Sequence, residues 1–210
     1  MRRRAFLASA LTAGTALTPG CGVIHPRTEH SNPTEKTDEN PRDDIQYLAF
    51  RADGSDLADV GVTPPSLDVP SEFATSIWHR DGTELRSLTQ RFATPGTEGS
   101  RPWPTLALEG PFMGDREPHP SVSLSRTQDG TAAVLEVHEF GELADETVTI
   151  NLIVTRWPES ARTLVVESTA ELAETGPREE THVLEGRLEF ALADGTGGEE
   201  RSDEPPQSPS

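Results

Sequence analysis

The chain has 210 residues, which argues for one domain or for one domain with tails. Asp and Glu number 36 against 18 Lys and Arg, giving a net charge of −18, so a basic surface that would neutralise nucleic-acid phosphates is excluded. Cys21 is the single cysteine, which excludes a disulfide framework and a thiolate zinc cluster within the chain. Hydrophobic residues make up 33% of the chain, enough for one modest core.

Residues 1–20 have the layout of an export signal. A cationic start is followed by an apolar stretch and then by small and turn-forming residues, and the apolar stretch is too short for a stable membrane span. Arg3 and Arg4 open the run Arg-Arg-Ala-Phe-Leu, which resembles the twin-arginine signal pattern and implies export of an already folded protein. An ordinary Sec signal that carries three arginines is the alternative.

Cys21 stands where a lipoprotein signal places its cysteine. The run Leu-Thr-Pro-Gly-Cys at residues 17–21 resembles a lipobox, in which a leucine and two small residues precede the cysteine, although this leucine lies one position earlier. The resemblance implies a lipid on Cys21, with the membrane as partner and the outer face of the cell membrane as location. A free exposed thiol outside the cell would be a liability, which favours this interpretation over plain secretion with an incidental cysteine.

Without residues 1–20, the expected mature chain has a more negative net charge than the full chain. Residues 1–20 hold three arginines and no acidic residue, so fifteen basic residues remain against 36 acidic ones, a net charge of −21. Lys36 is the only lysine. This composition resembles proteins of extreme halophiles, particularly haloarchaea, where molar salt screens carboxylate repulsion. Intrinsic disorder is the alternative explanation of such a composition.

Composition divides the mature chain into three parts. Residues 21–44 are rich in proline and charge without an apolar pattern, which predicts a flexible tether. Residues 194–210 combine Gly, Pro, Ser and acidic residues, which predicts a disordered acidic tail. The folded domain is therefore expected at residues 45–193.

Within residues 45–193 the periodicity is that of strands, which argues against disorder there. Apolar and polar residues alternate most clearly in 184–192 and 148–154. Further strands are predicted at residues 45–50, 73–79, 83–92, 105–108, 121–126 and 133–137 and from residue 164 onward. Asp81-Gly82 and Asp129-Gly130 predict hairpin turns, and no window of ten residues has helical spacing. These signals predict an all-β, antiparallel β-sandwich, most simply an immunoglobulin-like one.

No motif in the domain specifies a catalytic or metal site. Residues 138–142 resemble the zinc-protease pattern, but Glu142 replaces the second histidine. Asp53, Asp56 and Asp59 are spaced by three, whereas a calcium loop spaces its ligands by two. The triplet His79-Arg80-Asp81 is interpreted as a hairpin tip, and the six histidines have no ligand spacing. We therefore predict no catalytic residue, no metal ligand and no cofactor.

Binding rather than catalysis is the favoured hypothesis. The protein is expected to be a cell-surface lipoprotein acting as a binding or structural module, with an unidentified protein or carbohydrate partner. The alternative is an envelope hydrolase that uses carboxylates and a histidine. Long proline-containing loops could form a binding surface, and the tryptophans could stack on a sugar but are expected to pack in the core or an interface. The segments concerned are Thr63–Pro70, Pro95–Pro104 and Pro111–Pro120, and the tryptophans are Trp78, Trp103 and Trp157.

Overall fold

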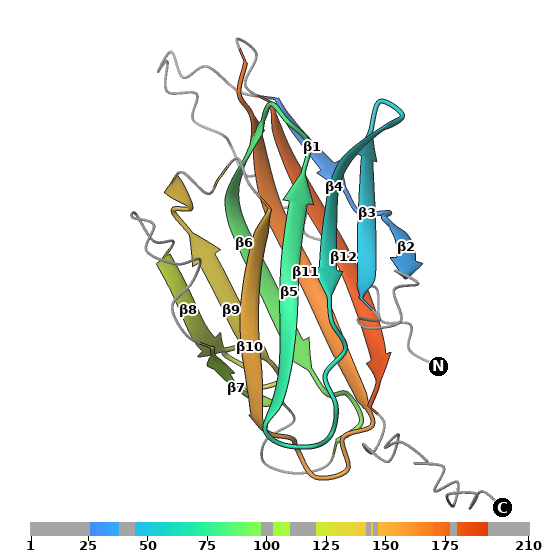
Figure 1. Cartoon of the computed structure of the whole chain (residues 1–210), viewed down its shortest axis with the longest axis vertical. Coiled ribbons are helices and arrows are strands. Elements are labelled where there is room, and N and C mark those ends of the chain that lie inside the picture. The colour runs from blue at the N-terminus through green and yellow to red at the C-terminus, as the bar shows by residue number, and fades with distance from the viewer. Residues whose placement is uncertain are drawn as a thin grey trace, which may run out of the picture.

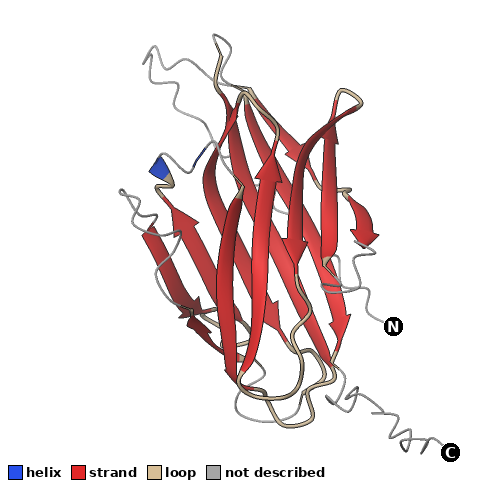
Figure 2. Cartoon of the chain, viewed as in Figure 1, coloured by secondary structure: helices blue, strands red, loops and turns tan. Residues whose placement is uncertain are grey.

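The structure, a computed structural model, describes residues 26–37, 45–97, 103–109, 121–141, 144, 147–176 and 180–192. Figure 2 shows this part of the chain as strands and loops, with helical conformation only at Gly141 and Ala144 among the described residues. Among the described residues, the structure holds no helix with the length and apolar character needed to cross a membrane. The predicted signal with Arg3 and Arg4, the lipid site Cys21 and the tail 194–210 lie outside the described residues.

The strands form two sheets that face each other as a sandwich (Figure 1). One sheet has the order β1-β12-β11-β6-β9-β8 and the other the order β2-β3-β4-β5-β10-β7. Neighbouring strands are antiparallel except β1 and β12, which are parallel. The strands are β1 (Arg27–His30), β2 (Thr34–Thr37), β3 (Gln46–Ala52), β4 (Ser55–Val62), β5 (Ser71–His79), β6 (Thr83–Ala93), β7 (Thr105–Leu108), β8 (Ser121–Arg126), β9 (Ala133–His138), β10 (Val148–Arg156), β11 (Thr163–Glu174) and β12 (Thr181–Ala191). The all-β sandwich prediction is confirmed, with more strands than the seven to nine of immunoglobulin domains.

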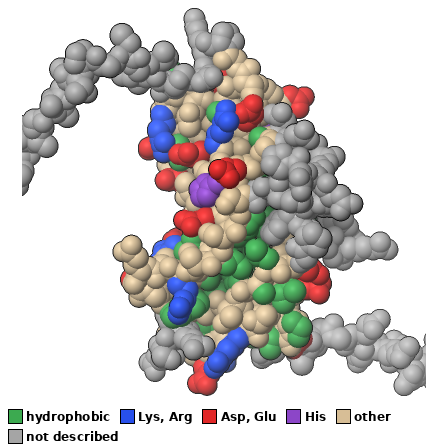
Figure 3. Space-filling model, turned by 90° about the vertical axis from the view of Figure 1, so that its left-hand side faces the viewer, with side chains coloured by type: hydrophobic (Ala, Val, Ile, Leu, Met, Phe, Trp, Pro, Cys, Tyr) green, Lys and Arg blue, Asp and Glu red, His purple; other side chains and the backbone are tan. Residues whose placement is uncertain are grey.

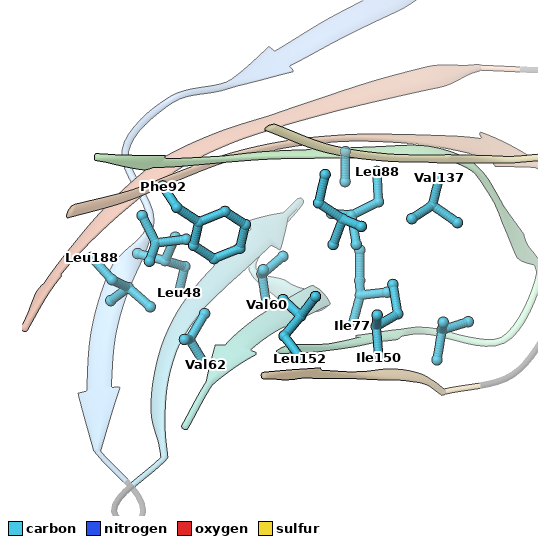
Figure 4. Packing of buried hydrophobic residues seen from close by; sticks show 14 of the residues in the cluster. Leu48, Val60, Val62, Ile77, Leu88, Phe92, Val137, Ile150, Leu152 and Leu188 are labelled. Atoms are coloured by element: carbon cyan, nitrogen blue, oxygen red, sulfur yellow. The ribbon is translucent and has the colours of Figure 1, made fainter. Parts of the chain in front are cut away.

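One core lies between the two sheets. On β12 the buried Leu184, Leu188 and Phe190 alternate with the exposed Glu185 and Glu189, as period-two strands require. Figure 4 shows side chains of the two sheets meeting in the middle layer. Those from the first sheet are Leu88, Phe92, Val137 and Leu188, and those from the second are Leu48, Val60, Val62, Ile77, Ile150 and Leu152.

The domain begins earlier than the sequence predicted. Residues 27–30 and 34–37, assigned above to the flexible tether, are the strands β1 and β2, which pair with β12 and β3 respectively. Neither strand contains an apolar residue, because each lies at the edge of its sheet and is held by backbone hydrogen bonds rather than by buried side chains. Hydrophobic periodicity therefore cannot reveal them.

The turns also differ in part from the prediction. Asp129-Gly130 connects β8 and β9, which do form a hairpin. Asp81-Gly82 connects β5 and β6, which belong to different sheets, so the predicted hairpin is a crossover between the sheets. The tightest hairpin is at Asp53-Gly54, where both residues have positive φ and link β3 to the unpredicted strand β4. Strand β4 is largely buried, so it lacks the alternation that marks a half-exposed strand.

The sandwich has two distinct ends. The entry end is where β1 begins, since Arg27 pairs with Thr181 at the start of β12, and it also holds the β3–β4, β5–β6 and β11–β12 turns (Figure 1). The exit end is where β12 finishes, and it holds the β8–β9 turn.

Candidate functional site

A cleft opens where β7 and β8, the edge strands of the two sheets, lie opposite each other. Its volume is about 320 Å³, at the lower limit of typical ligand pockets. Figure 3 views this side of the molecule and shows hydrophobic side chains gathered in its lower half. The lining residues are Trp103, Pro104, Thr105, Leu106, Leu124, Ser125, Arg126 and Ala133. The cleft lies toward the exit end, because Thr105 pairs with Arg156 and Ala133 with Phe92.

Trp103 forms one wall of this cleft and is held on two sides. Its ring packs over the β8–β9 turn, where a Cβ built on Gly130 would lie 3.7 Å from Cζ3. The guanidinium of Arg126 lies 5.6 Å from the ring centroid, within cation–π range. Arg126 supplies the charge, Thr105 and Ser125 the hydroxyls, and the remaining lining residues the apolar surface. Such a lining can hold a partly apolar, neutral or anionic group.

A second constellation, at the entry end, is the histidine–glutamate cluster of His30, His182, Glu174 and Glu180. Nε2 of His30 lies 3.2 Å from Nδ1 of His182, with the two rings tilted at 50°. Oε1 of Glu174 lies 3.4 Å from Nε2 of His182, and Oε1 of Glu180 lies 4.0 Å from its Nδ1. The His182 side chain is almost fully buried, at 4% exposure. Both ring nitrogens of the buried His182 thus face polar partners.

Strand pairing, a backbone hydrogen bond in a turn and two side-chain hydrogen bonds position the four side chains of this cluster. Parallel pairing of β1 with β12 brings His30 beside His182. A backbone hydrogen bond from Glu174 N–H to the Glu180 carbonyl, 2.8 Å, closes the β11–β12 turn and brings both glutamates to its base. Arg80 donates to Oε1 of Glu174 at 2.7 Å, and Thr28 donates its hydroxyl to Oε1 of Glu180.

The electrostatics of the cluster favour a neutral His30. Burial lowers the pKa of His30 below its ordinary value, and the adjacent His182 ring lowers it further. Glu180 acts in the opposite direction, with a smaller effect. A neutral imidazole keeps a ring nitrogen able to accept a proton or bind a metal ion. In the described part of the chain, one donor atom each from Glu174, Glu180 and His182 lies within 4.8 Å of the others, a spacing that could hold a metal ion.

The acidic triplet of the sequence does not converge. Asp53 lies in the β3–β4 turn, Asp56 is paired with Arg51 at 2.9 Å, and Asp59 is part-buried on β4. Burial raises the pKa of Asp59, with Lys36 acting against it. In the described part of the chain these carboxylates do not form a metal-binding group. His138 ends β9 and is exposed, in agreement with a polar strand end, while Glu142 lies outside the described residues.

The tryptophans divide between two environments. Trp103 and Trp157 are part-buried against the core, as predicted, and Nε1 of Trp157 donates to the Ser66 carbonyl at 2.9 Å. Trp78 does not join the core, because it projects from the outer face of β5 with 40% exposure. Of the predicted binding loops, the end of Pro95–Pro104 does contribute to the cleft, and Pro111–Pro120 lies outside the described residues.

Sequence reasoning missed the histidine–glutamate cluster because its parts are far apart along the chain. His30 and His182 are separated by 152 positions, and His30 lay in the segment assigned to the tether. The local signal is slight: Glu180, the residue before β12, lies two positions from His182, a spacing that places two side chains on one side of extended backbone. Only the pairing of β1 with β12 shows which histidine lies beside them.

The comparisons with known proteins identify a family. Residues 27–194 match the family described as Domain of unknown function (DUF8121). The chain belongs to this family. The DUF8121 match starts at the first residue of β1, which agrees with the earlier domain boundary. No curated protein matches the sequence.

Two of the solved structures that match are domains of F-spondin. A crystal structure of the human F-spondin reeler domain is 11% identical, with a TM-score of 0.36, covering 83% of this DUF8121 chain and 99% of that one. A crystal structure of the Reelin-N domain of F-spondin is 8% identical, with a TM-score of 0.36, covering 81% of this chain and 93% of that one. Similarity at this level supports no statement about function.

Proposed function

We propose that this protein is an extracytoplasmic lipoprotein, anchored to the outer face of the cell membrane through Cys21, whose β-sandwich is a binding module. The observation that carries the proposal is the position of the sole cysteine, which directly follows the signal-like residues 1–20. The pattern at Arg3 and Arg4 favours the twin-arginine route, by which the sandwich would be exported already folded.

Because β1 already begins at Arg27, the linker between Cys21 and the sandwich is short. Only residues 22–26 separate Cys21 from Arg27, and six residue steps of at most ~3.6 Å span about 20 Å. A lipid on Cys21 would therefore hold the entry end close to the membrane and direct the exit end outward. The cleft with Trp103 lies toward the exit end, where a partner outside the cell can reach it.

The lining of the cleft favours binding over hydrolysis. A hydrolase of the carboxylate-and-histidine type needs an acid and a base that face the substrate. Among the described residues that line the cleft there is no Asp, Glu or His, and Arg126 is the charged one. Thr105 and Ser125 can donate hydrogen bonds, so the cleft suits a ligand that combines an apolar part with a neutral or anionic polar group.

Replacement of the anchor residue tests the proposal. In cells that express the full chain, Cys21→Ser should move the protein from the membrane fraction into the medium, or leave an unprocessed precursor. The wild-type protein should stay with the membranes through a high-salt wash, because stable anchoring requires two lipid chains rather than charge contacts. Fractionation with mass spectrometry of the mature N-terminus makes the measurement. Membrane association of a correctly cleaved Cys21→Ser protein would contradict the lipoprotein proposal.

A further inference from the structure

The hydrogen bonding of His182 assigns a role to each of its ring nitrogens. Nε2 faces the carboxylate of Glu174, which can only accept, so Nε2 carries the proton. In the neutral ring Nδ1 then has a lone pair, which accepts a hydrogen bond from Nε2–H of His30. A metal ion bound between these two nitrogens would take the place of this proton, with His30 in its other tautomer. Oε1 of Glu180 lies 4.0 Å from the same Nδ1. Two ring nitrogens therefore meet between β1 and β12, with one carboxylate oxygen near the nitrogen of His182.

The spacing of these atoms suits a transition-metal ion. Zinc binds imidazole nitrogen at ~2.0–2.1 Å in a tetrahedral arrangement, which places two ligand nitrogens about 3.3 Å apart. The observed separation between His30 Nε2 and His182 Nδ1 is 3.2 Å. Oε1 of Glu180 is 4.0 Å from Nδ1 and accepts the Thr28 hydroxyl, so this carboxylate would turn away from Thr28 to become the third ligand.

The surroundings of His182 match those of a ligating histidine. Such a histidine usually donates its second ring N–H to a carboxylate, which fixes the orientation of the ring. Glu174 occupies this position at 3.4 Å from Nε2, and Arg80 holds Glu174 at 2.7 Å. Glu174 is thus a positioning residue, and Arg80 keeps its carboxylate in place.

We propose that His30, His182 and Glu180 bind a divalent transition metal ion of the zinc class, with Glu174 orienting His182. Imidazole nitrogens favour Zn²⁺ over the hard cations Ca²⁺ and Mg²⁺, which require oxygen ligands. The bound ion joins β1 to β12 and so ties the strand nearest the N-terminus to the sandwich. The site is independent of the cleft and of any lipid on Cys21.

Calorimetric titration tests the site in the mature chain. Cys21→Ser is used as the background, so that no thiol contributes, and the protein carries no histidine tag. Zn²⁺ should bind with 1:1 stoichiometry, while Ca²⁺ and Mg²⁺ at the same concentrations should not. At a hundredfold excess over the dissociation constant, Zn²⁺ should raise the melting temperature by about 5–10 °C. Bound Co²⁺ should give the intense visible absorption of a tetrahedral site.

Variants identify the ligands. His30→Gln and Glu180→Gln should each weaken Zn²⁺ binding at least about tenfold, and both lie on part-exposed positions where the apo fold should persist. His138→Gln, on the exposed end of β9, is the matched control and should bind like the parent. In the parent protein, ring-nitrogen NMR signals of His30 and His182 should shift on adding Zn²⁺. Binding that His30→Gln leaves unchanged, equal binding of Ca²⁺, or no 1:1 complex would overturn the proposal.

Discussion

Gly186 shows how one missing side chain permits the two sheets to meet. It lies on β12, where an added Cβ would be 2.6 Å from Cδ1 of Leu48 and 3.0 Å from Cγ of Pro33. Leu48 belongs to β3 of the opposite sheet and is buried, so it has little room to move. Pro33, between β1 and β2, closes the other side. The glycine is needed here for close approach rather than for an unusual φ.

We predict that Gly186→Ala lowers the free energy of unfolding by about 1–3 kcal/mol, the usual cost of overpacking a core. Gly176→Ala is the matched control, because no described atom lies within 4 Å of a Cβ at that position and its φ is outside the left-handed region. The control should stay within about 0.5 kcal/mol of the parent. Chemical denaturation of both variants makes the measurement. Equal free energies of unfolding of the two variants would show that Leu48 and Pro33 can move aside without loss of stability.

At the scale of elements, β1 and β2 are the least expected parts of the fold. They cover the outer edges of β12 and β3, and both consist of polar and charged residues. Without β1, the backbone groups of residues 181–184 on the outer side of β12 would be unpaired, and such an edge invites pairing with another molecule. These short strands therefore protect the sheet edges.

We predict that a chain beginning at Ile45 is less stable than one beginning at Pro26. Removal of β1 and β2 breaks their backbone hydrogen bonds and uncovers Gly186 where Pro33 packs. The melting temperature should fall by roughly 5 °C or more, and the shorter chain should self-associate. Thermal circular dichroism and size-exclusion chromatography of the two chains make the comparison. Identical melting and a monomeric short chain would show that residues 26–44 are dispensable, as a flexible tether would be.

At the scale of the whole molecule, the acidic residues outnumber the basic residues that could form ion pairs with them. In the described residues, ion pairs join Arg27 to Glu171, Arg51 to Asp56, Arg80 to Glu174, Arg86 to Glu84, Arg91 to Glu167 and Arg187 to Glu189. Most of these pairs are largely exposed and contribute little each. Residues 21–210 have 36 acidic residues against fifteen basic ones, so many carboxylates repel one another.

We predict that the stability of the domain rises with potassium chloride up to molar concentrations. The screening length is ~10 Å at 0.1 M salt and ~3 Å at 1 M, so molar salt removes most of the repulsion between exposed carboxylates. The variant Asp68→Asn, Glu72→Gln, Glu185→Gln neutralises three exposed positions and should need less salt. Far-UV circular dichroism against potassium chloride measures both proteins. Full stability of the parent protein in low salt would contradict the halophilic interpretation. If the variant needs as much salt as the parent, the salt requirement arises in the core and not from the acidic surface.

The sequence alone determined which segments become strands with one face in the core. Strands such as β10 and β12 alternate buried and exposed residues, and this alternation is written directly in the chain. It also determined the absence of helical periodicity and the all-β class. It could not reveal β1 and β2, whose stability comes from backbone pairing, or β4, where consecutive buried residues interrupt the alternation.

Only the tertiary structure decided which strands are neighbours and which side chains meet. Asp81-Gly82 was predicted as a hairpin turn, yet the strands on either side enter different sheets, because pairing depends on the whole sandwich and not on the turn. For the same reason His30 and His182 show no relation in the sequence. Their approach to 3.2 Å follows from one parallel pairing between the first strand and the last. Local composition specifies a strand, whereas a site made from distant strands exists only after the chain has folded.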